Sequence, residues 1–535
     1  KKLDAALQAG LILPLSEAYK IPLVFDENID KHQRDTNYLE FHRKNLKSNI
    51  FGVGYRFLHD RVQQAAYSFI PESEKQATHY KIGQLLLNKI SPELLSENIL
   101  DVVNQLNFGV DLLVEQSEKD ELAKLNLIAG EKAKVATAYE AAVRYLETGL
   151  ALLTNDSWRN TYKLTLNLYV ETAEAEYLSG NFEKSKQLGN IVLQKASNIL
   201  DKVKIYETKI QSCMAENLLQ EALEIGITVL SILGVRLPVE PKIHNLLSSF
   251  AQTNLVLFGK RIEDLAYLQR MTDPYKLAAM KILMLIAPAA SMVNSLKFPL
   301  AIFAMVRLSV KYGNSVYAAY GYSIYGAIIC EKFEDIERGY RFGQLGILLL
   351  DKLNANSLKC KVYFVFNAMI RQFKEPVAKS ITPILAGIQS GLDYGDIEYS
   401  SYSAWNISNH LFLTSNNLEI IEQTILKYAG LMHQLKLKSV ALTISIIKQT
   451  VLSFKEKSFN KIGLIDEVFD ESNVSSILGN NTTWLSILYS GKTVTNYFFG
   501  DYIQAIENAR LTEKYQESNP GFYLYCVNNY YYSLS

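Results

Sequence analysis

Apolar side chains recur three and four positions apart along most of the chain after residue 73. This spacing places them on one face of an α-helix and therefore predicts a mainly α fold for that region. Several expected helices begin alike, with a turn residue, a large apolar residue and, three positions later, a small residue where two helices can cross closely. Three such starts follow one another, at Tyr139 with Ala142, Phe182 with Ser185 and Leu219 with Ala222.

The repeated start indicates stacked helical repeats. The small residues are 43 positions apart from 142 to 185 and 37 apart from 185 to 222. Such self-similarity is typical of solenoids, in which each repeat packs on its neighbours. The unit resembles the tetratricopeptide helix pair, with a longer and less regular spacing, and an irregular all-α domain is the alternative. Further copies are Tyr502 with Ala505, which matches best, and the weaker Phe333 with Ile336 and Leu418 with Ile421.

Residues 1–72 are the only region with strand character. A helical segment stops at Gly10, an extended apolar segment ends at Pro14, and SNIFGVGYRFL (48–58) alternates around two glycines. A helix, turns and a β-wing that leads into a last helix from Asp60 predict a winged-helix domain. Residues 1–90 hold 13 Lys and Arg against 10 Asp and Glu. That surplus is too small for a typical DNA-binding winged helix.

Prolines divide the rest of the chain. Pro238 and Pro241 stand close together in GVRLPVEPKI, where neither a helix nor a sheet accommodates both. We therefore expect a mainly α protein in which a small N-terminal winged-helix domain precedes a tetratricopeptide-like α-superhelix (α-solenoid). Its expected parts are the winged helix at 1–72, connecting helices at 73–119, repeats at 120–234, a proline-containing linker at 235–259 and a second repeat block at 260–535, truncated at the C-terminus.

Composition narrows the functional classes. The 55 basic residues balance 55 acidic ones, so no overall charge favours nucleic acid or an anionic membrane. The four cysteines are far apart, which fits reduced thiols in a cytoplasmic protein better than disulfides or zinc. The longest apolar run, 282–293, has the length of a core helix and is too short to span a bilayer. The chain starts at Lys1 without a signal peptide, so we interpret it as an internal fragment of a larger cytoplasmic protein.

Motifs for catalysis or metal binding are weak. Gly491, Lys492 and Thr493 form a GKT triplet, but the earlier glycine of a phosphate loop is replaced by Ser486 and a helical pattern precedes it. No two of the seven histidines are spaced i, i+4, and no cysteines are close enough in sequence to chelate a metal. We expect neither a catalytic residue nor a metal ligand in this chain.

His59 and Asp60 stand where the alternating strand pattern gives way to a helix. A phosphoacceptor histidine is typically followed by an acidic residue and then a proline, which HDRVQQ lacks. A metal-dependent phosphohydrolase would need further ligands that the sequence does not offer. The structural alternative is that the Asp60 carboxylate caps the helix 61–70 while His59 packs against the wing.

A resemblance gives these two residues a functional alternative. YRFLHDRVQQAAYSFIP (55–71) resembles the end of the winged-helix domain in signal-transduction ATPases of the STAND class, where a Met-His-Asp or Leu-His-Asp triplet closes the nucleotide site. Most of the chain is similar to large bacterial proteins that join a Ser/Thr kinase, a predicted ATPase, helical repeats, a GAF domain and a sensor histidine kinase. The stretches that carry this likeness are ATHYKIGQLLL (77–87), ENILDVVNQLNFG (97–109), residues 121–153, MTDPYKLAAMKIL (271–283) and RGYRFGQLGILLLDKL (338–353).

The resemblance implies roles for His59 and Asp60. His59 would contact the terminal phosphate of ADP held by an upstream ATPase domain, and Asp60 would hold the helix start. A helix N-terminus disfavours the protonated ring, so His59 would act as a neutral donor. Leu58 replaces the commoner Met with little change in volume. The family's Walker loops precede the winged helix and its kinase modules lie outside these residues, so ATP or ADP is expected in the parent protein and no cofactor or enzymatic activity in this chain.

The predicted function is therefore regulatory. The segment would couple the nucleotide state of the upstream ATPase to downstream kinase modules of the same chain, with a protein or peptide partner on the repeats. No membrane or nucleic-acid partner is expected. The alternative is a transcriptional regulator with a DNA-binding winged helix and effector-binding repeats.

Overall fold

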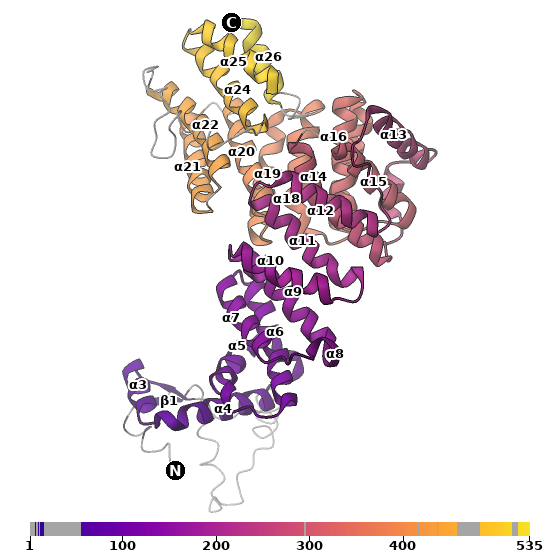
Figure 1. The fold of residues 1–535 in the computed structure, drawn as a ribbon. Coiled ribbons are helices and arrows are strands. Elements are labelled where there is room, and N and C mark those ends of the chain that lie inside the picture. The colour runs from indigo at the N-terminus through magenta and orange to yellow at the C-terminus, as the bar shows by residue number, and fades with distance from the viewer. Residues whose placement is uncertain are drawn as a thin grey trace, which may run out of the picture. The chain divides into compact units, whose positions relative to one another are not determined.

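The chain is mainly α-helical, as predicted (Figure 1). A computed structural model describes residues 6, 9, 11–14, 55–293, 296–414, 417–435, 437–456, 482–515 and 523–535. The residues form two compact units, Lys1–Asn181 and Phe182–Ser535. Each unit is described by itself below.

The first unit joins a short strand pair to a series of helices. The strands are antiparallel, with Ile12 opposite Phe57. From α4 onward each long helix packs on the next, and Ile99, Leu146 and Leu168 are fully buried between them. The elements are β1 (Ile12–Pro14), β2 (Tyr55–Phe57), α3 (Asp60–Ser68), α4 (Glu72–Lys89), α5 (Pro92–Phe108), a 3₁₀ turn (Val110–Leu112), α6 (Gln116–Val135), α7 (Tyr139–Ala151), α8 (Ser157–Asn160) and α9 (Tyr162–Leu178).

The described residues cover only the two ends of the region that is predicted to be a winged helix. The β1–β2 pair and α3 occupy the positions expected for a strand, a wing strand and the last helix. Residues 15–54, which hold the rest of the pattern, lie outside the described part of the chain. The winged helix therefore stays a prediction.

The second unit is a longer run of helices. The α-helices are α10 (Phe182–Lys195), α11 (Ile199–Ala215), α12 (Leu219–Ile232), α13 (Ile243–Leu257), α14 (Pro274–Met292), α15 (Lys297–Tyr312), α16 (Ala318–Lys332), α17 (Ile336–Lys352), α18 (Lys359–Val365), α19 (Ile381–Asp393), α20 (Ile397–Thr414), α21 (Leu418–Gln434), α22 (Lys438–Glu456), α24 (Thr482–Phe498), α25 (Tyr502–Tyr515) and α26 (Leu524–Leu534). Shorter turns are 3₁₀ segments at Glu263–Tyr267, Asn356–Leu358, Arg371–Phe373 and Val377–Ser380, and a π-turn at Phe366–Ile370.

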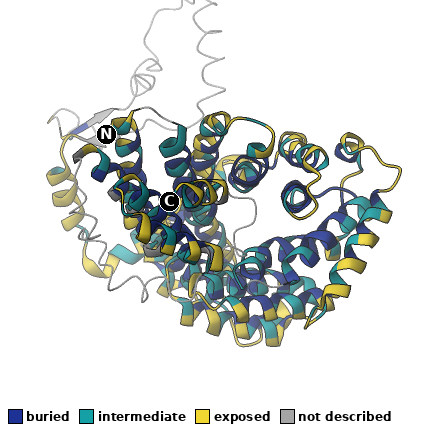
Figure 2. Cartoon of the chain, turned by 90° about the horizontal axis from the view of Figure 1, so that it is seen from above, coloured by how far each residue is buried: buried dark blue, intermediate teal, exposed yellow. Residues whose placement is uncertain are grey.

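Packing in the second unit follows chain order. Each even-numbered helix from α14 to α26 contacts the next even-numbered one, and we call these helices the helix row. The odd-numbered helices α15, α17, α19, α21 and α25 pack against their sequence neighbours in the row. Buried residues lie on the facing sides of the helices and exposed residues on the outer sides (Figure 2). Packing between near neighbours is consistent with the predicted α-solenoid.

One turn recurs before six of the described helices. Each has a residue in the left-handed region, with φ between 54° and 84°, two positions before the helix starts. These residues are Thr137, Gly180, Asn217, Glu334, Gly395 and Gly500, ahead of α7, α10, α12, α17, α20 and α25. In five of the turns the next residue donates its N–H to a carbonyl five positions back, at 2.7 to 2.9 Å, as in a Schellman cap.

Most of the helix starts predicted from the repeated pattern are confirmed. Tyr139, Phe182, Leu219, Leu418 and Tyr502 are each the first residue of a helix. The small or apolar residues three positions later, Ala142, Ser185, Ala222, Ile421 and Ala505, are all buried. The copy assigned to Phe333 was wrong by three residues, because α17 starts at Ile336 after the turn at Glu334. Its small residue is Gly339, where a Cβ would come within 2.5 Å of the Gly326 carbonyl oxygen.

The segment predicted as a linker, 235–259, contains helix α13. Val235 and Leu237 belong to the same buried hydrophobic cluster as Leu230 of α12 and Met280 of α14. α12 ends ahead of the prolines, in a left-handed turn at Gly234 where the Val235 N–H donates to the Leu230 carbonyl at 2.8 Å. The prolines do not separate the surroundings of α12 from those of α14, because the two helices pack directly. The boundary between the compact units falls at 181/182.

The apolar run 282–293 forms most of α14, with Pro288 inside the helix. Among the described helices, α14 alone is long and apolar enough to cross a membrane by length and composition. It packs against α11, α12 and α15, and Ile282, Leu283 and Ile286 are fully buried there. Its surroundings are those of the predicted core helix.

Candidate functional site

His59 and Asp60 lie at the start of α3, and both are exposed. The prediction that the Asp60 carboxylate caps this helix was wrong. His59 is the N-cap residue, with extended backbone angles, and its ring Nδ1 accepts a hydrogen bond from the Arg61 N–H at 3.1 Å. Asp60 is the first helical residue, where its negative charge still interacts favourably with the helix dipole.

The cap determines what the imidazole could offer a ligand. Because Nδ1 accepts from Arg61, a neutral ring carries its hydrogen on Nε2. Nε2–H is then the group available to donate to a phosphate oxygen. The arrangement is compatible with the proposed contact to ADP, and that role stays a prediction.

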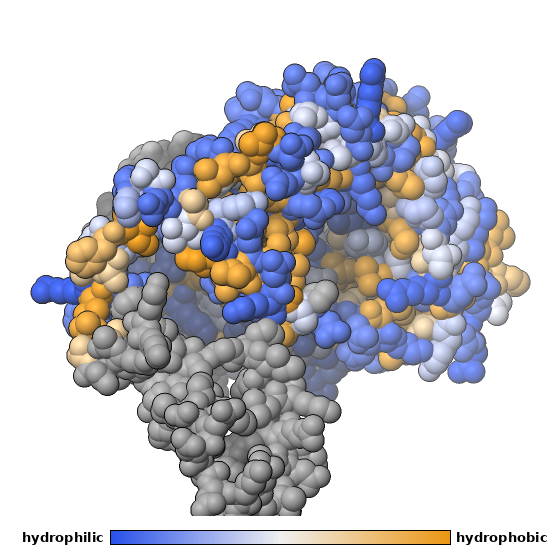
Figure 3. All heavy atoms as spheres, turned by 90° about the horizontal axis from the view of Figure 1, so that it is seen from below, coloured by the Kyte–Doolittle hydropathy of each residue, from blue (hydrophilic) through white to orange (hydrophobic). Residues whose placement is uncertain are grey.

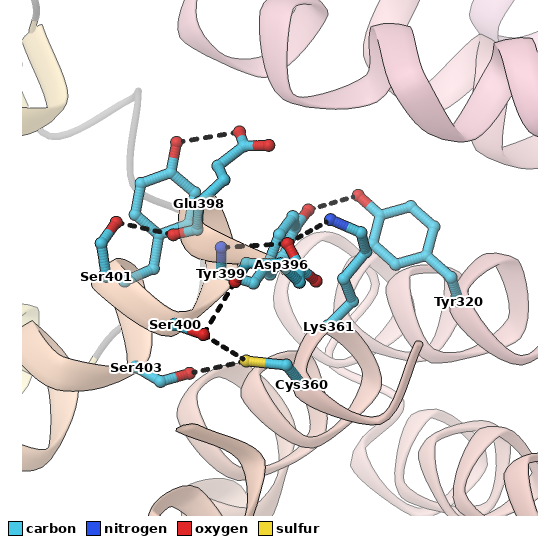
Figure 4. A network of polar contacts seen from close by, with 10 residues as sticks. Tyr320, Cys360, Lys361, Asp396, Glu398, Tyr399, Ser400, Ser401 and Ser403 are labelled. Atoms are coloured by element: carbon cyan, nitrogen blue, oxygen red, sulfur yellow. Dashed lines mark hydrogen bonds and ion pairs between the residues drawn. The ribbon is translucent and has the colours of Figure 1, made fainter. Parts of the chain in front are cut away.

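A second group of polar residues lies inside the helix row, between α16, α18 and α20 (Figure 4). Most of its members come from the start of α20, GDIEYSSYS at 395–403, which follows the left-handed turn at Gly395. Tyr320 reaches it from α16, and Cys360 and Lys361 reach it from α18. We call these side chains the α16–α18–α20 network.

An ion pair connects α18 to the start of α20. Lys361 Nζ lies 3.0 Å from Asp396 Oδ1, and the two side chains are only 14% and 10% exposed. The ammonium also lies 3.9 Å from the centre of the Tyr399 ring. The second carboxylate oxygen, Asp396 Oδ2, is buried and accepts no hydrogen bond from the described residues. A buried carboxylate oxygen of this kind is costly unless its charge is balanced, and Lys361 supplies that balance.

Tyrosine hydroxyls extend the network on both sides. The Tyr320 and Tyr399 hydroxyl oxygens are 2.9 Å apart, which links α16 to α20. The Tyr402 hydroxyl donates to Glu398 Oε1 at 3.1 Å within α20. Burial raises the pKa of the Glu398 carboxyl above its ordinary value, and the nearby Lys361 charge opposes that rise. Burial also raises the pKa of Tyr399 and Tyr402 well above the usual range.

Cys360 contributes a thiol to this network. Its Sγ lies 3.8 Å from Ser400 Oγ and 3.9 Å from Ser403 Oγ. Burial raises the pKa of the Cys360 thiol to about 11, so the reactive thiolate is disfavoured at neutral pH. The contacts suit a packed thiol that holds α18 against α20.

The network can hold three helices of the row in one register. Its interhelical hydrogen bonds and ion pair join side chains that are 35 to 79 positions apart in sequence. No base lies beside an activated nucleophile in it, and the described residues contain no group of three or more His, Cys, Asp or Glu that could hold a metal. The GKT triplet lies inside helix α24, as the sequence indicated.

The glycine in YGDIE (394–398) indicates a helix end followed by a new helix start, but the local sequence does not reveal which residues the start of α20 contacts. Nothing in that segment marks Asp396 and Glu398 as members of the network. Lys361 and Tyr320 carry no local signal, because their pairing depends on how α16, α18 and α20 stack. A lysine flanked by apolar residues, such as Lys361 between Cys360 and Val362, was the available hint.

Comparison with known proteins points to signalling. No protein-family model matches the chain. Over 443 residues it is 22% identical to the protein named "Hybrid signal transduction histidine kinase G" from Dictyostelium discoideum. The match covers 75% of this chain and 13% of that protein, so the chain spans about an eighth of the relative's length. The similarity supports a role in signal transduction, and the mainly helical fold is compatible with it.

Proposed function

We propose that this chain is the helical-repeat regulatory and interaction segment of a signal-transduction histidine kinase. The observation that carries the proposal is the match to a hybrid histidine kinase over three quarters of the chain. Neighbour-to-neighbour packing supports it, because a stack of helices can present a long surface and pass a displacement along its length.

The finer part of the proposal concerns the input. An ATPase domain of the STAND class precedes the segment in the parent protein, and the Nε2–H of His59 donates to the terminal phosphate of its bound ADP. α3 then carries the nucleotide state into the repeats, and the repeats carry it to kinase modules further along the chain. ATP and ADP are ligands of the parent, this segment performs no catalysis, and the protein works in the cytoplasm. The exposed N-cap position of His59 supports this, since its ring is accessible to a neighbouring domain.

Replacement of His59 tests the proposal in the full-length protein. Loss of one hydrogen bond to a charged phosphate weakens the ADP-held state by about 1.5–3 kcal/mol, or roughly tenfold or more in population. His59→Ala should therefore speed ADP dissociation and raise basal autophosphorylation. Asp60→Asn, the matched control, should change both less, because it keeps the His59 cap. Unchanged ADP dissociation in His59→Ala, with only a lower melting temperature, would leave His59 as a helix cap alone.

We do not propose the alternative of a DNA-binding regulator. The surplus of three positive charges over residues 1–90, 13 against 10, offers little attraction to phosphate backbones. Salt-dependent retention of the chain on heparin and duplex DNA would support the DNA-binding alternative instead.

A further inference from the structure

Helix α13 packs on α15 by one face and leaves an apolar face exposed. Ser249, Thr253 and Leu257 are buried on the packed side, where the Ser249 and Thr253 hydroxyl oxygens accept hydrogen bonds from the partly buried Arg307 guanidinium at 2.8 and 2.9 Å. On the opposite face Ile243, Leu247 and Leu255 are 61%, 59% and 74% exposed, with the small, exposed Ala251 between them. These four residues are spaced by four, so they form one continuous stripe along the helix. We call it the α13 stripe.

Apolar residues are also exposed beyond both ends of the helix. Val239 before α13 is 72% exposed, and Phe258 after it is 87% exposed. Single exposed apolar residues are ordinary, and Figure 3 shows several among hydrophilic residues on one face of the molecule. Five large apolar side chains within residues 239–258, each more than half exposed, form an arrangement that monomeric proteins rarely leave in water.

α13 is also an addition to the regular stack. α12 and α14 pack directly on each other although α13 lies between them in sequence. α13 instead packs on α15, and Figure 1 shows it at the margin of the second unit. The packing order of the neighbouring helices therefore continues from α12 to α14 without it. A helix retained outside the stack, with an apolar outer face, is suited to contact another molecule.

Charge selects the kind of partner. No Asp, Glu, Lys or Arg occurs between Ile243 and Leu257, and the exposed polar residues beside the stripe are His244, Ser248 and Gln252. A face without formal charge offers nothing to complement an acidic or basic partner, and it does not repel an identical face. A two-fold axis perpendicular to α13 brings the same patch of both copies together with the two helices antiparallel. Glu240 at one end of the stripe then comes to the end that carries Lys260 of the other copy.

We infer that the α13 stripe is a self-association surface, and that its partner is the α13 stripe of a second copy of this chain. Ala251 near its middle lets the two helices approach closely, while Ile243, Leu247 and Leu255 interdigitate on either side. A helix of 15 residues is about 22 Å long, so the contact buries on the order of several hundred Å² per copy. That is less than the roughly 800 Å² per partner of a standard interface, so the dimer is weak and depends on concentration.

Sedimentation velocity of the 535-residue chain at concentrations from about 1 to 300 µM tests the inference. These concentrations are chosen because so small a contact is expected to give a micromolar dissociation constant. The expected result is a monomer that shifts to a dimer as concentration rises. Leu247→Glu should raise the dissociation constant at least tenfold, because a two-fold dimer contains the substitution twice and the added charge meets an apolar face. Leu255→Glu should do the same from the other side of Ala251.

Ile503→Glu is the matched control. Ile503 is 72% exposed on α25, away from α13 in the sequence, and its replacement should leave the monomer–dimer equilibrium unchanged. All the substituted side chains are exposed, and unchanged circular dichroism would show that the variants fold. A chain that stays monomeric at the highest concentration would overturn the inference. So would a Leu247→Glu variant that dimerises as the unmodified chain does.

Discussion

Asp396 has two roles: it caps the start of α20 and it pairs with a lysine of another helix. It follows the left-handed Gly395, donates its N–H to the Gly391 carbonyl and accepts from the Tyr399 N–H at 3.4 Å. Its carboxylate also pairs with Lys361 of α18. The corresponding residues of the turns before α17 and α25, Asp335 and Asp501, cap their helices in the same way. Among the described residues, only Asp396 of these three also forms an ion pair with another helix.

The Lys361–Asp396 pair should matter far more for stability than an exposed pair. Lys361→Met leaves the nearly buried Asp396 carboxylate without its counter-charge, which should cost about 3–5 kcal/mol of unfolding free energy. Lys374→Met removes a partner of Glu337, with side chains 41% and 67% exposed, and should cost under about 1 kcal/mol. Denaturant unfolding of both variants measures this. Adding Asp396→Asn to Lys361→Met should restore part of the loss, and a further loss would contradict the assignment.

His410 should make the second unit sensitive to mild acid. It is buried, its Nδ1 lies 2.6 Å from Ser380 Oγ, and burial lowers its pKa from 6.5 to about 4. Between these pH values the unfolded chain binds a proton that the folded chain does not, so folding stability falls as pH falls from 6.5 to 4. The loss from this residue is about 3 kcal/mol at the acid end.

The measurement is the denaturation midpoint at several pH values between 7 and 4. His410→Gln should flatten the fall relative to the unmodified chain. His433→Gln, which replaces an exposed histidine of α21, should leave the fall unchanged. If the denaturation midpoints of His410→Gln and the unmodified chain fall in parallel, His410 does not cause the loss of stability in acid.

At the scale of elements, local sequence predicted the helices well and their partners poorly. Helix starts at Tyr139, Leu219 and Tyr502 follow from turn chemistry and apolar spacing within about ten residues. The start of α17 was placed three residues early because Phe333 matched the large apolar residue of the repeated start, whereas the left-handed turn at Glu334 puts that residue at Ile336. α13 was missed because Pro238 and Pro241 indicated a linker, although apolar residues spaced by four follow them. Contacts such as Lys361 with Asp396 depend on the stacking of whole helices, which no local pattern encodes.

Alanine substitutions at two glycines test whether the left-handed turns need glycine for stability. Gly395 has φ +73° and open space where a Cβ would lie, so Gly395→Ala should cost about 1–2 kcal/mol through the backbone alone. Gly430 lies inside α21, also with open space around it and without the positive φ. Gly430→Ala should instead stabilise the chain by about 0.5–1 kcal/mol. The melting temperature should therefore fall for Gly395→Ala and rise for Gly430→Ala. Melting temperatures that shift in the same direction would show that the left-handed conformation at Gly395 does not explain the effect.

At the scale of the molecule, the stack of helices in the second unit has the arrangement that the proposed relay requires. In the second unit, helices far apart in sequence connect mainly through the neighbours between them, so a displacement at one end passes through the row. The α16–α18–α20 network lies within that row and joins three of its helices. If the row carries the signal from His59, weakening the network should interrupt it without affecting the site where the signal starts.

The rate of autophosphorylation of the full-length protein tests this claim most directly, measured for the unmodified protein, His59→Ala, Lys361→Met and the double variant. ADP dissociation from the same four proteins reports whether the input still responds. The account predicts that His59→Ala speeds both processes, and that in the double variant ADP dissociation stays fast while autophosphorylation returns to the level of Lys361→Met alone. Autophosphorylation that rises equally with and without Lys361 would contradict a relay through the helix row.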